Sequence, residues 1–133
     1  MGNTLNIDLY PTICNLCGGE VVYISNANIY GKPYGSGYCY FCTKCGGYVG
    51  THKPRPKEAF GIIANSSMRK AKRICHDIFD KLWKTRTERQ ELYKRLADEM
   101  GIPFEYCHFG YFNMYQLRLA YTILKGWEEK WDS

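Results

Sequence analysis

The feature that most constrains the fold of this chain is a repeated Cys-x-x-Cys-Gly-Gly motif, at 14–19 and again at 42–47. Each copy places two thiols at the tip of a tight turn. The glycine after the second cysteine supplies the positive φ angle that lets backbone amides approach the sulfurs. Two such turns together offer the four thiolates of a tetrahedral zinc site. We therefore predict that one structural Zn²⁺ is held by Cys14, Cys17, Cys42 and Cys45.

Other roles for the thiols fit the pattern less well. A redox role would require an exposed Cys-x-x-Cys motif at a helix N-terminus. Cys39 could replace Cys42 as a ligand, but the pair Cys39 and Cys42 lacks the following Gly-Gly. The chain has an odd total of 7 cysteines and no secretory signal pattern at its start, which argues against a disulfide framework. These features predict a cytoplasmic protein whose thiols stay reduced.

The order of residue patterns predicts an α+β fold. Strands are expected at 20–25, 37–42 and 48–49, with turn-rich segments at 31–37 and 52–57. The spacing of the two motifs around these strands is the layout of a zinc ribbon. We expect a zinc-ribbon β module over 1–58, packed on a three-helix region over 59–133, the two forming one compact domain. The chain has no apolar run of about eighteen residues, so no membrane contact is expected.

Three helices are expected in the second part. The first covers 66–84 with Asn65 as its N-cap. The second starts after Thr85 or Thr87, each of which fits a capping box with Glu88 or Gln90 three residues on, and it ends at Gly101. The third begins near Asn113, where Gln116 completes a second capping box. Their predicted buried faces are Ala71, Cys75, Ile78, Phe79, Leu82 and Trp83, then Leu92, Tyr93, Leu96 and Met100, then Met114, Leu117, Ala120, Tyr121 and Leu124.

A basic segment follows the second motif. The formal net charge of the chain is +5, and the segment contributes Lys53, Arg55, Lys57, Arg69, Lys70, Lys72 and Arg73. Only Glu58 opposes them, which indicates a partner carrying phosphate or an acidic protein surface. The alternative is a solvated face that serves solubility. Nearby tyrosines offer stacking surfaces for bases, or simple packing, at Tyr30, Tyr34, Tyr38 and Tyr40.

The histidines supply the case for catalysis. His76 and Asp80 share a helix face, and His108 lies before the third helix, so the three could form a metal-dependent or acid–base site. The alternative is that they cap and bridge helices. His52, beside the second motif, could donate to a cysteine sulfur. No nucleophile or phosphate-binding loop accompanies them, so we expect no enzyme.

Four segments carry a family resemblance: CNLCGGEVVYISNANIYGKPYG, CTKCGGYVGTHKPRP, GIIANSSMRKAKRICHDIFDKLWK and LADEMGIPFEYCHFGYF. Over residues 12–124 the chain resembles the zinc-finger-containing domain family of phage and prophage proteins. The resemblance favours Cys42 and Cys45 as ligands, because the family has a hydrophobic residue near position 39. The chain departs from the family's Pro-Leu-Gly at 59–61, which leaves the shape of that loop open.

The resemblance implies a phage or mobile-element origin, and some type II-A anti-CRISPR proteins are similar in being compact, cytoplasmic and metal-containing. The leading hypothesis is a non-catalytic zinc protein that inhibits or redirects a host nucleic-acid machine, such as a Cas9-type nuclease complex, by protein–protein binding. The first alternative is a phage regulator that binds DNA or RNA directly. The second is a small metal-dependent nuclease using the histidine set.

Overall fold

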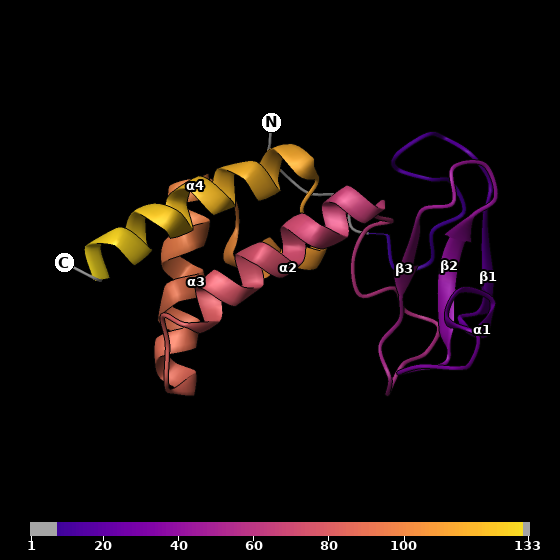
Figure 1. The fold of residues 1–133 in the computed structure, drawn as a ribbon, viewed down its shortest axis with the longest axis horizontal. Coiled ribbons are helices and arrows are strands. Elements are labelled where there is room, and N and C mark those ends of the chain that lie inside the picture. Colours follow the sequence, from indigo (N-terminus) through magenta and orange to yellow (C-terminus); the bar gives the residue numbers. More distant parts are fainter. Residues whose placement is uncertain (1–7, 132–133) are drawn as a thin grey trace. The chain divides into compact units, whose positions relative to one another are not determined.

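The computed structural model describes residues 8–131 of the chain and divides them into two compact units (Figure 1). Residues 8–67 form the ribbon unit and residues 68–131 form the helical unit. Each unit is described by itself below. Among the described residues, no helix combines the length and the apolar character needed to span a membrane.

The ribbon unit is built on a three-stranded antiparallel sheet in the order β1-β2-β3. Its strands are β1 (Val21–Ser25), β2 (Tyr38–Cys42) and β3 (Tyr48–Gly50), as the sequence predicts. A short helix, α1 (Ala27–Tyr30), lies in the connection between β1 and β2. The register opposes Val21 to Cys42 and Tyr40 to Val49, so alternate residues of the three strands face the same side.

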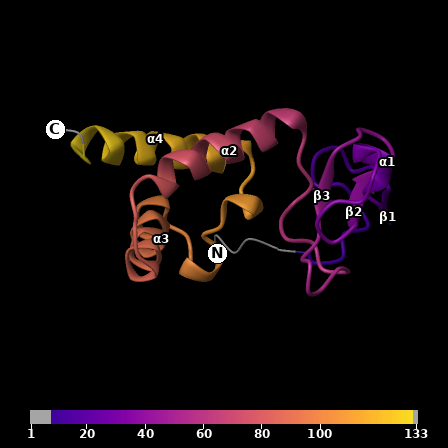
Figure 2. The same cartoon turned by 60° about the horizontal axis from the view of Figure 1, so that its bottom comes forward.

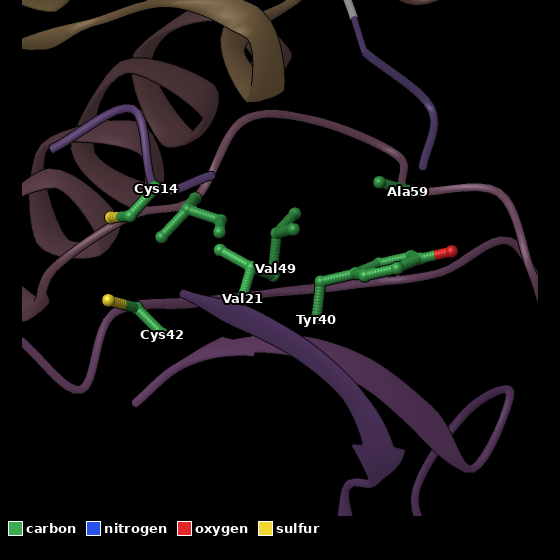
Figure 3. Close-up of a cluster of buried hydrophobic side chains, with 7 residues drawn as sticks. Cys14, Val21, Tyr40, Cys42, Val49 and Ala59 are labelled. Atoms are coloured by element: carbon green, nitrogen blue, oxygen red, sulfur yellow. The ribbon is translucent and has the colours of Figure 1, made fainter. Parts of the chain in front are cut away.

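The core of the ribbon unit lies on one face of this sheet (Figure 3). It consists of seven residues: Cys14, Val21, Tyr40, Cys42, Val49, Ala59 and Ile63. Figure 3 shows the Cys14 and Cys42 sulfurs at one end of the cluster and the Tyr40 hydroxyl at the other. The chain from 59 to 67 therefore packs with the sheet, and bridges pair Thr51 with Ala59 and Tyr48 with Ala64.

The helical unit contains three long helices, in agreement with the sequence prediction. They are α2 (Ser66–Asp80), α3 (Arg86–Met100) and α4 (Met114–Trp131), with 3₁₀ turns at Phe104–Tyr106 and Phe109–Tyr111. In both views α3 runs across the directions of α2 and α4 (Figures 1 and 2). The large side chains that are fully buried in the helical unit come from all three helices and from the residue after the second 3₁₀ turn. They are Phe79, Leu96, Phe112, Leu117 and Leu124.

Two predicted capping boxes are confirmed. The Thr85 hydroxyl accepts from the Glu88 N–H, and the Glu88 carboxylate accepts from the Thr85 N–H at 3.0 Å. Asn113 and Gln116 exchange the equivalent pair of hydrogen bonds, each at 2.9 Å. Both boxes satisfy N–H groups that have no partner inside the helix, which fixes where α3 and α4 begin.

The predicted end of α2 is wrong by four residues, because the helix ends at Asp80 and not at Lys84. The Lys84 N–H donates to the Glu88 carboxylate at 2.8 Å, so α3's capping box draws this residue away from α2. The Asp80 carboxylate also accepts from the Trp83 indole at 3.1 Å, which holds the turn that follows. The helix starts at Ser66, directly after the predicted cap Asn65.

The predicted buried faces hold for most positions. Cys75, Ile78 and Phe79 of α2 and Leu117, Ala120 and Leu124 of α4 are buried, as expected. The prediction is wrong for Tyr121, which is exposed. The α+β fold class is confirmed, while the expected boundary at 58 and the packing of both parts into one domain stay predictions.

Candidate metal centre

The four predicted zinc ligands come together at one end of the sheet, where β2 ends at Cys42. The sulfurs of Cys14, Cys17, Cys42 and Cys45 all lie within 4.8 Å of one another. The close pairs join different motifs, with Cys14 to Cys45 at 3.7 Å and Cys17 to Cys42 at 3.5 Å. A disulfide would need about 2.05 Å. A tetrahedron with Zn–S bonds of about 2.3 Å has edges of about 3.8 Å, so these separations fit a zinc ion.

The two motifs fold into equivalent turns. The Gly18 N–H donates to the Cys14 carbonyl at 2.9 Å, and the Gly46 N–H donates to the Cys42 carbonyl at 3.0 Å. The two glycines have φ angles of +78° and +80°, in the left-handed region that side chains rarely adopt. The glycine after each Cys-x-x-Cys is therefore required by the backbone, as the sequence predicts.

The second glycine of each motif has a different role, because it lies against the opposite turn. A Cβ atom at Gly19 would stand 2.6 Å from the Lys44 Cβ and 3.1 Å from the Cys42 sulfur. A Cβ atom at Gly47 would stand 3.1 Å from the Leu16 side chain. Leu16 and Lys44 hold the same place in their motifs, so each turn packs on the other in the same way.

Backbone N–H groups surround the sulfurs and stabilise negative charge on them. Leu16 donates to Cys14 and Lys44 donates to Cys42, both at 3.3 Å. The N–H groups of Cys45 and Lys44 together lower the pKa of the Cys42 thiol to about 6. Hydrogen bonding to the thiolate favours the deprotonated form, which is the form that binds metal.

Side chain–backbone bonds and strand pairing position the ligands. Cys42 ends β2 opposite Val21, and Cys14 follows the bridge from Ile13 to Glu20. The Asn15 side chain donates to the Ile63 carbonyl and accepts from the Ile63 N–H, both at 2.9 Å. The first turn is thereby fastened to the segment that completes the core.

The four cysteines form one structural zinc site. Four thiolates fill a tetrahedral coordination shell, which leaves no position for water or substrate. Cys39 is not part of it, because residues three apart on a strand point to opposite faces. Cys39 is buried, and this burial raises the pKa of its thiol. Cys75 is buried in α2, as predicted.

The predicted histidine set is only partly brought together. The His76 ring lies 3.3 Å from the Asp80 carboxylate, and Asp80 is also engaged by the Trp83 indole. His108 packs edge-on against the Tyr111 ring at 5.2 Å. Within residues 8–131, the only cluster of three or more potential metal ligands is the cysteine cluster. His52 packs against the Phe60 ring at 5.8 Å, while the sulfurs receive backbone N–H groups.

The basic residues are divided between the two units. Lys53, Arg55 and Lys57 lie exposed in the loop after β3. Lys70 and Arg73 are exposed on α2 and Arg69 is half-buried there. Lys72 is half-buried and donates to the Gly110 carbonyl at 3.3 Å, and its role as a partner contact stays a prediction.

One contributor to the surface of the ribbon unit, Tyr23, is not predicted from the sequence. Tyr23 stacks on Tyr38 with ring centroids 5.1 Å apart, and its hydroxyl donates to the Pro56 carbonyl at 2.6 Å. The alternation of Val21 and Tyr23 along β1 could have placed this ring on the core face beside Tyr38 and Tyr40. The strand register needed for that step is not visible in the sequence alone.

Comparison with known proteins gives one family. A family model described as a zinc-finger-containing domain matches residues 10–127 of the chain. Neither the search of curated proteins nor the search of solved structures returned a match.

Proposed function

The chain belongs to the zinc-finger-containing domain family, and from this premise we propose that it is a non-catalytic binding protein that acts on a nucleic-acid machine of a bacterial host. In its concrete form, the protein is of phage or mobile-element origin, works in the reducing cytoplasm, and inhibits or redirects a Cas9-type nuclease complex by protein–protein binding. The observation that carries the proposal is the closed four-thiolate site, with its close sulfur pairs at 3.5 and 3.7 Å.

Because the site is closed, the zinc ion contributes to folding and not to catalysis. Four protein sulfurs leave the zinc no open coordination position, so the ion holds the two turns and does not activate water. The two turns hold the sheet, and strand pairing fixes the positions of the residues on its surface. This is the arrangement expected of a scaffold that presents a surface to a partner.

The distribution of charge supports a partner with negative charge. Lys70 and Arg73 are exposed within the first two turns of α2, where the helix dipole already adds positive potential. That placement disfavours the isolated helix and favours an acidic surface or phosphate beside it. We therefore propose that these two residues contact the partner.

We further propose that His76, Asp80 and His108 do not catalyse a reaction. The contact of His76 with Asp80, and of Asp80 with Trp83, gives these side chains a role in ending α2. Replacing His76, Asp80 and His108 together by alanine is expected to leave binding to the partner unchanged. Loss of a metal-dependent cleavage activity in this variant would support the nuclease alternative.

The test uses the intact zinc-loaded chain and a purified Cas9–guide RNA complex from a type II-A system. We expect the chain to co-elute with the complex and to slow cleavage of target DNA. The double variant Lys70→Glu/Arg73→Glu is expected to weaken both effects. The matched control Lys81→Glu/Lys84→Glu changes the same charge at positions just beyond the α2 end and is expected to leave both intact.

Three results would contradict this proposal in whole or in part. If the chain neither co-elutes with this complex nor changes its cleavage rate, the Cas9-type partner is wrong. If no nuclease or polymerase complex from the host retains the chain on a column, the binding role itself is wrong. Equal effects of the two double variants would place the contact elsewhere on the molecule.

A further inference from the structure

A short stack of tyrosine rings ends at Tyr38 on the surface of the ribbon unit. Tyr23 lies between Tyr40 and Tyr38, with ring centroids 5.1 Å from each, and it is nearly parallel to Tyr38 at 10°. Tyr23 thus covers one face of the Tyr38 ring, yet Tyr38 remains 42% exposed. The face of Tyr38 that points away from the stack is therefore open to solvent.

The same rings hold the basic loop (residues 52–57) beside Tyr38. The Tyr23 hydroxyl donates to the Pro56 carbonyl, and the Tyr40 hydroxyl donates to the Lys57 carbonyl, both at 2.6 Å. Tyr40 belongs to the core that contains Cys42, so the loop is tied to the same framework as the zinc site. The open ring and the loop cations consequently lie on one surface with a fixed relation to each other.

The basic loop is held in shape by hydrogen bonds of its own backbone. The His52 N–H donates to the Glu58 carbonyl at 3.0 Å, and the Glu58 N–H donates to the Arg55 carbonyl at 2.9 Å. Pro54 and Pro56 each fix a backbone φ angle within it. A loop that is already fixed loses little conformational entropy on binding, which favours its use as a recognition element.

The charge of this surface is positive. Arg55 is paired with Glu58 at 2.9 Å, and Asp8 accepts a hydrogen bond from the Tyr10 N–H at 2.9 Å. Within the part of the chain that the structure describes, Lys53 and Lys57 make no ion pair, although both are exposed. Two unpaired cations therefore flank the loop beside an open aromatic ring.

We propose that this surface binds single-stranded nucleic acid, with a base stacked on Tyr38 and phosphates contacting Lys53, Arg55 and Lys57. Every base has a π-face that can stack on tyrosine, and the phosphate backbone provides the complementary charge. A duplex keeps its bases stacked inside the helix and cannot use the ring. The inference rests on the proposed function in that the ribbon unit is a binding scaffold, and it names what that scaffold holds.

The test measures binding of a labelled oligothymidylate, an oligouridylate and a DNA duplex to the intact zinc-loaded protein at low salt. Both single strands are expected to bind more tightly than the duplex. The ratio of the dissociation constants of the two single strands shows whether DNA or RNA is preferred. Tyr38→Ala should weaken binding about 5- to 160-fold through loss of stacking. Tyr38→Phe keeps the ring and should bind as the unchanged protein does.

A matched control and a second readout separate this surface from general effects. Tyr115 is a 76% exposed tyrosine on α4, and Tyr115→Ala should leave binding unchanged. The double variant Lys53→Met/Lys57→Met should reduce the slope of log affinity against log salt by about 1.4, or about 0.7 for each phosphate that the variant no longer neutralises. Unchanged zinc content in every variant shows that the ribbon unit remains folded.

Several outcomes would overturn the inference. They are no binding of either single strand at low salt, duplex binding as tight as single-strand binding, or equal losses from Tyr38→Ala and Tyr115→Ala. Oligoglutamate binding that depends on the two lysines and not on Tyr38 would assign the surface to an acidic protein. If the unchanged protein inhibits the Cas9 complex but binds neither single strand, only this inference fails and the proposed function stands.

Discussion

The two units of the chain reach stability by different routes. The ribbon unit buries seven residues in its core, and two of them, Cys14 and Cys42, are zinc ligands. The helical unit buries large side chains completely, among them Phe79, Phe112 and Leu117. A small sheet with so few apolar residues gains much of its folding free energy from the metal, whereas the helices gain theirs from packing.

The kind of hydrogen bond differs in the same way. In the ribbon unit, side chains fasten loops to the sheet, as the Asn15 amide does with Ile63 and the Tyr40 hydroxyl does with Lys57. In the helical unit, the capping boxes of α3 and α4 act locally, within four residues of sequence. The ribbon unit is therefore specified by contacts between distant residues, and the helical unit by local signals together with an aromatic core.

Zinc removal should separate the two units most clearly. Cys42→Ala is expected to abolish zinc binding and to unfold residues 8–67, because binding to structural zinc contributes on the order of 10 kcal/mol. The helices should keep their protection, since their core contains no zinc ligand. Hydrogen exchange resolved by residue, with zinc content measured on the same sample, checks both statements.

Cys39→Ala is the matched control, because Cys39 lies on the same strand and is equally buried. We expect this variant to retain one zinc per chain. If Cys39→Ala lost zinc and Cys42→Ala kept it, the zinc ligand would be Cys39 and not Cys42. Loss of helical protection together with the ribbon would show that the units do not fold independently, and the contrast between them would fail.

The reverse perturbation is Phe79→Ala in the helical unit. The Phe79 ring lies 4.4 Å from Tyr93 and 5.7 Å from Phe109, measured between ring centroids, and the residue is fully buried. Its truncation should reduce the free energy of unfolding of the helices by about 3–5 kcal/mol. Zinc content and the protection of the β2 amides should be unchanged. Release of zinc on this substitution would contradict the separation.

The stability of the helical unit should depend on pH because of Lys72. Burial, with help from the charge of Arg69, lowers the pKa of Lys72 from 10.5 to about 8. The unfolded chain keeps this proton up to about pH 10.5, so it binds more protons than the folded chain between pH 8 and 10.5. The Lys72 contribution to stability is therefore unfavourable below pH 8 and is relieved as pH rises through that window.

Lys72→Met removes this contribution and should stabilise the helical unit at pH 7 by about 2 kcal/mol, allowing for the part of the side chain that water screens. Urea unfolding of the two proteins at pH 7 and pH 10 should show this difference shrinking with pH. Lys70→Met, at an exposed position of the same helix, should show no such change. A difference that is constant with pH would mean that Lys72 stays charged in the folded state.

Much of the fold could be predicted because its signals are local. The repeated Cys-x-x-Cys-Gly-Gly turns, the Thr85 and Asn113 capping boxes and the glycine at 101 each act within a few residues, and each is confirmed. The end of α2 could not be predicted from its apolar period, since the Glu88 carboxylate takes the Lys84 N–H. A periodic pattern gives a helix face but not the competition between neighbouring caps.

The parts that escaped prediction depend on contacts between distant residues. Tyr121 follows the apolar period of α4 but is exposed, because no other described element covers that position fully. The burial of Lys72 requires the Gly110 carbonyl, 38 residues away along the chain. The anchoring of the basic loop by Tyr23 and Tyr40 requires the strand register. None of these partners can be assigned from spacing in the sequence.

The smallest expected effect contrasts a glycine of each unit. Gly126 lies inside α4, and a Cβ atom there would meet nothing within 4 Å, so Gly126→Ala should stabilise the helical unit by about 0.5–1 kcal/mol. Gly19→Ala should act with the opposite sign on the ribbon unit, because its Cβ would stand 2.6 Å from the Lys44 Cβ. Thermal unfolding of the first variant and zinc release to a competing chelator from the second measure the two effects. Equal tolerance of both substitutions would mean that the two zinc turns can separate without losing the metal.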